Sequence, residues 1–107
     1  MDIARTILDQ LGGNRFVMLT GCNSFVGDKD TLRMSIPRNY SKANRLWITL
    51  NEKDLYDMRF FRFRRGHINR NGEFIPEKID EEKVYSDIYF DQLQEVFTRH
   101  THLYTHF

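Results

Sequence analysis

Apolar and polar residues alternate along the middle of the chain with the period of two that is typical of half-buried β-strands. Residues 32–36 and 45–50 have this pattern, and a further strand is predicted over about 56–68. The dipeptide Asn71-Gly72 favours a tight hairpin turn, which leads into a short strand at 73–75. Because these segments follow one another along the chain, we expect them to pair as an antiparallel meander.

The two ends of the chain have the helical period instead. Apolar residues on one face predict a short helix over 3–11, with Asp2 as its N-cap and Gly12-Gly13 as its end. The spacing from Tyr89 to Phe97 predicts a C-terminal helix of about three turns. Ser86 or Asp87 is its predicted N-cap. Elsewhere the sequence predicts a central strand at 15–20, a turn at 27–30 and an acidic, irregular stretch at 76–87.

These elements predict an α+β fold, in which an antiparallel meander sheet of four to five strands packs against the N- and C-terminal helices. The length of 107 residues is that of a single domain, which we expect to span residues 1–107. The predicted core consists of Phe16, Met18, Leu32, Met34, Leu46, Ile48, Leu93 and Phe97.

The composition indicates the class of protein and its cellular compartment. The hydrophobic fraction of 40% and the charged fraction of 29% are those of an ordinary globular protein. A lone cysteine, Cys22, cannot form an internal disulfide, and no signal peptide or apolar run of about 20 residues is present. We therefore expect a cytoplasmic protein with no membrane attachment. The sequence leaves its oligomeric state open.

The most unusual local feature is a basic and aromatic stretch, Arg59–Arg70, with no acidic residue between Met58 and Gly72. Guanidinium groups neutralise phosphates and aromatic rings stack on bases, so the stretch is a candidate site for single-stranded nucleic acid. The candidate residues are Arg59, Arg62, Arg64, Arg65, Arg70 and Phe61.

A structural interpretation competes with this one. The phenylalanines would point into the core, and the arginines would pair with the acidic residues Glu77, Asp80, Glu81, Glu82 and Asp87. The formal net charge is +1, from 16 basic and 15 acidic residues, and offers a polyanion little long-range attraction. The charge balance therefore favours the structural interpretation.

No residue pattern of a known active site is present. Cys22 follows the run 15–20 without a recognisable base and is expected to be a small apolar filler. His100, His102 and His106 lack the further ligands that a zinc site needs. The chain has no phosphate-binding loop, dinucleotide-binding motif or nucleophile elbow. We expect a protein that is not an enzyme and binds no cofactor and no metal.

Several segments, in order along the chain, resemble a family of small proteins of bacteriophages, prophages and related mobile elements. These segments are Ile7–Phe16, Met18–Gly21, Leu32, Ile36–Arg38, Ala43-Asn44, Ile48–Leu50, Asp54–Asp57, Phe60, Tyr89, Asp91–Leu93, Phe97 and Leu103–Thr105. The family has no established activity, and a small residue such as alanine usually stands where this chain has Cys22. The resemblance implies a phage or mobile-element setting and no mechanism.

Two functions follow as hypotheses. In the first, the chain is a non-enzymatic interaction module that contacts a host or element-encoded protein through an exposed sheet edge or its long loops. In the second, it binds single-stranded nucleic acid through the Arg59–Arg70 stretch.

Overall fold

A computed structural model describes residues 2–103 of the chain. The helices are α1 (Ile3–Leu11), α2 (Asn14–Thr20), a 3-10 turn η1 (Phe90–Gln92) and α3 (Leu93–Thr101). The strands are β1 (Asn23–Gly27), β2 (Thr31–Ser35), β3 (Arg45–Leu50), β4 (Tyr56–Arg64), β5 (His67–Ile68), β6 (Phe74–Ile75) and β7 (Lys78–Ile88).

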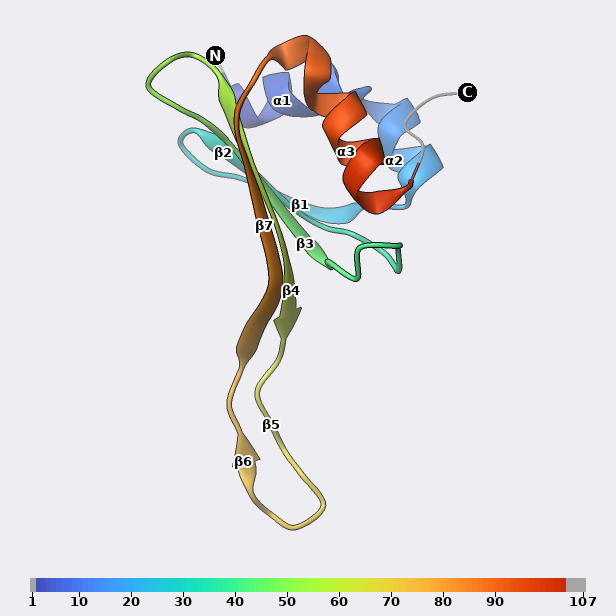
Figure 1. Cartoon of the computed structure of the whole chain (residues 1–107), viewed down its shortest axis with the longest axis vertical. Coiled ribbons are helices and arrows are strands. Elements are labelled where there is room, and N and C mark those ends of the chain that lie inside the picture. The colour runs from blue at the N-terminus through green and yellow to red at the C-terminus, as the bar shows by residue number, and fades with distance from the viewer. Residues whose placement is uncertain (1, 104–107) are drawn as a thin grey trace.

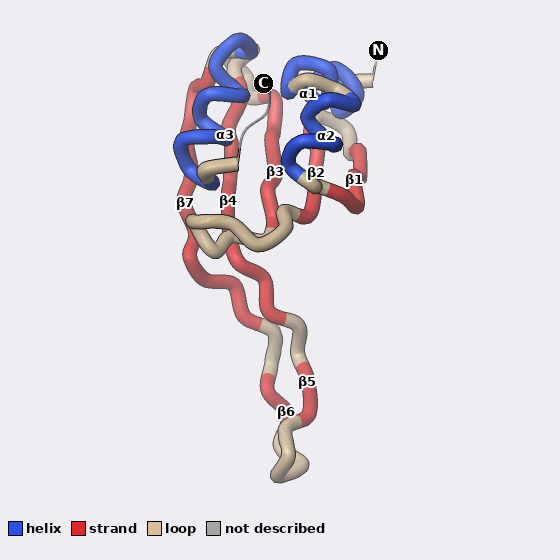
Figure 2. The backbone as a smooth tube through the Cα atoms, turned by 90° about the vertical axis from the view of Figure 1, so that its right-hand side faces the viewer, coloured by secondary structure: helices blue, strands red, loops and turns tan. Residues whose placement is uncertain are grey.

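Five strands form one antiparallel sheet in the order β1-β2-β3-β4-β7, and β5 pairs with β6 in a separate hairpin. The three helices lie on the same face of the sheet (Figures 1 and 2). The predicted α+β meander with N- and C-terminal helices is thus confirmed. No helix within residues 2–103 is long and apolar enough to cross a membrane.

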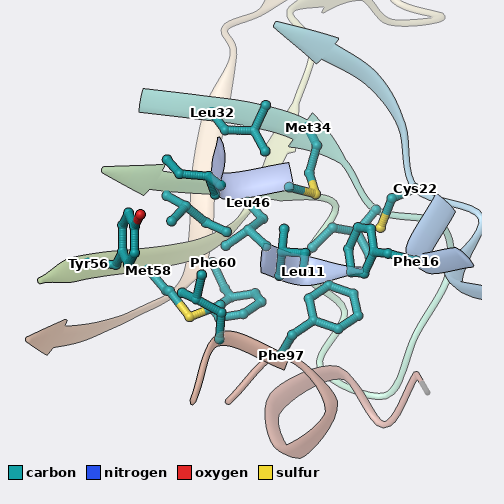
Figure 3. Close-up of a cluster of buried hydrophobic side chains, with 14 of the residues drawn as sticks. Leu11, Phe16, Cys22, Leu32, Met34, Leu46, Tyr56, Met58, Phe60 and Phe97 are labelled. Carbon is teal, nitrogen blue, oxygen red and sulfur yellow. The ribbon is translucent and has the colours of Figure 1, made fainter. Parts of the chain in front are cut away.

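The core lies between the sheet and the helices (Figure 3). Alternate residues of β2, β3 and β4 face it, and α1, α2 and α3 cover them. At its centre the ring of Phe97 lies 5.0 Å from that of Phe16 and 6.3 Å from that of Phe60. Of the predicted core residues, all are buried except Met18, which is 83% exposed.

The prediction of a strand at 15–20 is wrong, because this run forms α2. Gly12, with φ of 126°, ends α1 and reverses the chain, so that α2 begins within a few residues. The buried residues of α2, Phe16 and Thr20, are four apart, which is the helical period. Met18 lies between them on the opposite side, and this explains its exposure.

The irregular stretch predicted at 76–87 is also wrong, because most of it belongs to β7, which pairs with β4 along its length. The pairing shifts register twice, and Glu81 and Asp87 have positive φ values of 53° and 58° near these shifts. Each shift has the form of a β-bulge, which interrupts the alternation that marks a strand in the sequence. Ser86 and Asp87 therefore lie in β7 and do not cap α3.

The strand β1 was not predicted, for a similar reason. Its register against β2 shifts between Asn23 and Val26, and Ser24 has a φ of 58°. Only Phe25 among its five residues is even partly buried, so the strand has no hydrophobic alternation.

The single strand predicted over 56–68 is divided in the structure. It ends as β4 at Arg64, and β5 then pairs with β6 beyond the sheet. The predicted turn at Asn71-Gly72 lies in the loop that joins β5 to β6. There the Gly72 N–H donates to the Asn69 carbonyl at 3.1 Å, and Gly72 has a positive φ of 80°. Residues 65–77, here called the arm, project away from the body of the molecule (Figure 1).

Candidate interaction surfaces

The face of the sheet opposite the helices carries one row of paired residues that crosses all five strands. Register pairs Val26 with Arg33, Arg33 with Trp47, Trp47 with Arg59, and Arg59 with Val84. Because facing residues of paired strands lie on the same side, this row forms a continuous strip on the helix-free face.

Cation–π contacts organise the strip. The guanidinium of Arg33 lies 4.4 Å from the ring centroid of Trp47, and that of Arg59 lies 5.3 Å from it. Arg59 also lies 4.5 Å from the ring centroid of Phe61. Each arginine has an acidic partner, since Arg33 pairs with Asp28 at 3.0 Å and Arg59 with Glu82 at 2.5 Å. Trp47 is therefore the half-buried ring between two fixed cations.

The structure separates the six predicted nucleic-acid-binding residues. Arg59 and Phe61 lie on the helix-free face, whereas Arg62 and Arg64 lie on the side of β4 that carries Phe60. Arg64 pairs with Asp80 of β7 at 3.6 Å. The remaining two, Arg65 and Arg70, are exposed residues of the arm.

Phe61 is not available for base stacking, because only 3% of it is exposed. The basic stretch therefore does not form one surface with an exposed aromatic ring at its centre. Two of its arginines instead pair with acidic residues of β7, as the structural interpretation of the sequence expects.

The arm exposes large apolar side chains. Ile68 is 71% exposed and Phe74 is 69% exposed, and Ile79, where the arm meets β7, is 49% exposed. Its acidic and basic residues balance, with Arg65 and Arg70 against Glu73 and Glu77. The arm thus offers apolar side chains with no strong charge.

The sheet edge formed by β7 is a poorer docking site than the arm. This strand has two bulges and carries several charged side chains, among them Glu82 and Lys83. Bulges and edge charges are the features by which proteins prevent another strand from pairing with an edge. The sequence suggested an exposed sheet edge or the long loops as a docking surface and did not predict the arm.

Burial shifts the pKa values of Cys22 and His100. Burial raises the pKa of the Cys22 thiol, which keeps it protonated and unreactive. The pKa of His100 is lowered by burial and, to a lesser extent, by Lys83. Its Nδ1 lies 3.0 Å from the Tyr85 hydroxyl, and its ring centroid lies 4.2 Å from that of Phe60. His100 is thus a packing residue between α3, β4 and β7.

Within residues 2–103, no three histidine, cysteine, aspartate or glutamate side chains are grouped so that they could hold a metal ion. His102 stacks on Tyr40, with ring centroids 4.1 Å apart, and His106 lies outside the described residues.

No protein-family model matches this chain, and neither the curated proteins nor the solved structures contain a match.

Proposed function

We propose that this chain is a non-enzymatic protein-interaction module that binds its partner through the arm. One observation carries the proposal: the arm projects from the body and exposes Ile68 and Phe74. Register pairs Ile68 with Phe74 directly across the hairpin. Exposing neighbouring apolar side chains is costly in water, and exposed apolar patches mark interaction sites.

The arm has no folding role that would account for these residues. Its strands β5 and β6 pair only with each other within the described structure, and Ile68 and Phe74 lie outside the hydrophobic core. An isolated two-stranded hairpin is marginally stable in water. Burial of Phe74 and Ile68 against a partner would supply the missing apolar contact.

The resemblance to phage and mobile-element proteins supports a partner that is encoded either by the host or by such an element. The charge balance of the arm favours a partner with an apolar groove over one with a strongly charged surface.

The experiment replaces residues 66–76 with Asn-Gly, so that Arg65 and Glu77 flank a two-residue hairpin turn. The wild type, this short-arm variant and Met18→Ser are compared as baits in quantitative pull-downs. Met18 is the matched control, because it is an exposed apolar residue of the body. We expect a protein that is retained by the wild type and by Met18→Ser and lost with the short arm.

The short-arm variant should keep its helical circular dichroism and its unfolding midpoint, since β4 and β7 remain paired up to Arg64 and Lys78. Capture of the same proteins by a folded short-arm variant would contradict the proposal.

A second candidate function, the binding of single-stranded nucleic acid, is favoured by the strip on the helix-free face. There the guanidinium groups of Arg33 and Arg59 lie beside Trp47, and phosphates would replace their carboxylate partners Asp28 and Glu82. Only Arg59 and Phe61 of the original candidate residues lie on this face, and Phe61 is covered.

The test of the second candidate is a titration with single-stranded DNA and RNA, followed through the fluorescence of Trp47, the one tryptophan of the chain. Binding should quench the indole and weaken with salt, with a log–log slope of about −0.7 per phosphate contacted. Arg33→Ala and Arg59→Ala together should reduce that slope. Unchanged fluorescence throughout the titration would exclude this face as the site.

A further inference from the structure

A hollow of about 690 Å³ lies where the loop between β2 and β3 meets β4. It lies beyond the hydrophobic core, on the side of β4 that carries Arg62 and Arg64. Figure 2 shows this loop crossing beside β4 and β7 below α3. The volume is within the range of about 300–1,000 Å³ that is typical of small-molecule sites.

The loop is held in place by its own hydrogen bonds. The side-chain amide of Asn39 donates to the carbonyls of Pro37 and Ala43, at 2.8 and 2.7 Å, and its oxygen accepts from Ser41. Asn44 exchanges two hydrogen bonds with the backbone of Phe63, at 2.9 and 2.7 Å. The wall of the hollow is thus preorganised, which lowers the entropic cost of binding a ligand.

Positive charge is concentrated in this hollow. Four cationic side chains and one carboxylate line it: Arg38, Lys42, Arg62, Arg64 and Glu81. This lining contrasts with the whole chain, whose net charge is only +1. A partly enclosed site lined by one sign of charge concentrates ions of the opposite sign.

Most of these cations have no acidic partner among the described residues. Arg64 pairs with Asp80 at 3.6 Å, whereas Arg38, Lys42 and Arg62 form no ion pair there. One Nη of Arg62 donates to the carbonyl of Lys42 at 3.1 Å, which fixes the guanidinium against the loop. Its Nε is buried without a hydrogen-bond partner in residues 2–103. Arg62 is therefore held against the loop and forms no ion pair within residues 2–103.

An aromatic ring borders the same hollow. Tyr40 is 74% exposed, and its ring is stacked on His102 at 4.1 Å with an interplanar angle of 4°. Guanidinium groups in a fork geometry match phosphate oxygens, and an exposed, fixed aromatic ring can stack on a base.

We propose that this hollow binds the phosphate of a nucleotide, with Arg38, Lys42 and Arg62 as the phosphate ligands and Tyr40 as the stacking surface for the base. The shared chemistry is a nucleoside phosphate, supplied either as a free nucleotide or as the phosphorylated end of a nucleic-acid strand. The site is separate from the arm and from the strip on the helix-free face. Failure of either proposed function would therefore leave this proposal unaffected.

The test is isothermal titration of the full chain with adenosine monophosphate, adenosine and inorganic phosphate. We expect the nucleotide to bind more tightly than phosphate alone, because the ring adds a stacking contact, and adenosine to show no measurable binding. Raising the salt concentration should weaken nucleotide binding. Equal binding of adenosine and its monophosphate, or no binding of the monophosphate, would overturn the proposal.

A 15-nucleotide DNA with and without a 5′-phosphate distinguishes the two sources. Tighter binding of the phosphorylated strand than of both the unphosphorylated strand and the free nucleotide identifies a strand end as the ligand. Tighter binding of the free nucleotide identifies a small molecule. Equal binding of both strands, at the affinity of the nucleotide or above it, would show that the terminal phosphate is not recognised and would overturn the proposal.

Variants connect the binding to the hollow. Arg38→Ala removes an exposed cation that has no described partner, and it should weaken the monophosphate about tenfold, the worth of one charge-assisted contact. Arg15→Ala, an exposed arginine of α2, is the matched control and should leave the affinity unchanged. Glu81→Gln removes the one carboxylate that lines the hollow and should tighten binding. Equal effects of Arg38→Ala and Arg15→Ala would place the phosphate elsewhere.

Discussion

Three phenylalanine rings meet at the centre of the protein, one from α2, one from β4 and one from α3. Phe16, Phe60 and Phe97 are each fully buried. The ring planes of Phe16 and Phe97 meet at 67°, an edge-to-face arrangement that adds to the energy of burial. This cluster joins both ends of the chain to the sheet.

Truncation of one ring should therefore destabilise the whole fold. We expect Phe97→Ala to lower the free energy of unfolding by about 3–5 kcal/mol, because it removes buried contacts and leaves a cavity. Met18→Ala should change it by less than about 0.5 kcal/mol, since Met18 is 83% exposed. Urea denaturation followed by circular dichroism measures both. Similar values for the two variants would contradict the packing of α2 and α3 described here.

His100 should make stability depend on pH. Burial, with a smaller contribution from Lys83, lowers its pKa in the folded state below the ordinary value of 6.5. The unfolded chain therefore binds a proton more readily, and the contribution of His100 to stability is present above pH 6.5 and is lost as the pH falls below it.

We expect His100→Asn to reduce this slope of unfolding free energy against pH, even though it removes ring contacts with Phe60 and Tyr85. Denaturation of wild type and variant between pH 5 and 7.5, roughly the range in which histidine titrates, provides the comparison. Parallel curves would show that His100 has no lowered pKa.

At the scale of elements, the turn between α1 and α2 determines how α2 is oriented relative to α1. Gly12 has φ of 126° and ψ of 2°, a conformation that residues with a Cβ rarely adopt. A Cβ added there would lie 3.3 Å from the Cβ of Phe16.

Gly12→Ala should lower the free energy of unfolding by about 1–3 kcal/mol, from backbone strain and crowding. Gly72→Ala is the matched control, because Gly72 also has a positive φ, of 80°, and has open space around it. The strain that Gly72→Ala introduces is confined to the arm. The global free energy of unfolding should therefore remain close to that of the wild type. Equal losses in the two variants would mean that the arm is part of the cooperative fold.

The elements that the sequence predicted correctly are those with an unbroken period. Leu32 and Met34 in β2, and Leu46 and Ile48 in β3, alternate without interruption, and both strands were predicted. In β7, Glu81 and Asp87 adopt positive φ where the register shifts, and alternation is lost at both places. A bulge depends on the partner strand, which the local sequence does not show.

The run 15–20 was predicted as a strand because four of its six residues are apolar. Its helical spacing, Phe16 to Thr20, is only one turn long, and periodicity cannot distinguish a strand from a helix over so short a run. The basic hollow was missed for another reason. Arg38 and Lys42 are far in sequence from Arg62, and only the fold of the loop brings them together.

At the scale of the whole molecule, a compact body carries a projecting arm. The extents of 49 × 32 × 21 Å reflect the length of the arm, which is visible in Figure 1. The body contains the hydrophobic core, whereas the arm exposes Ile68 and Phe74. We propose that the arm is a binding element rather than a folding element.

Photo-cross-linking in living cells tests this claim most directly. A benzophenone amino acid replaces Phe74 at the arm in one variant and Met18 on α2 in another, since both are exposed apolar positions. The account predicts one discrete cross-linked partner from position 74 and none of that mass from position 18. A partner that cross-links equally from both positions, or from position 18 alone, would contradict it.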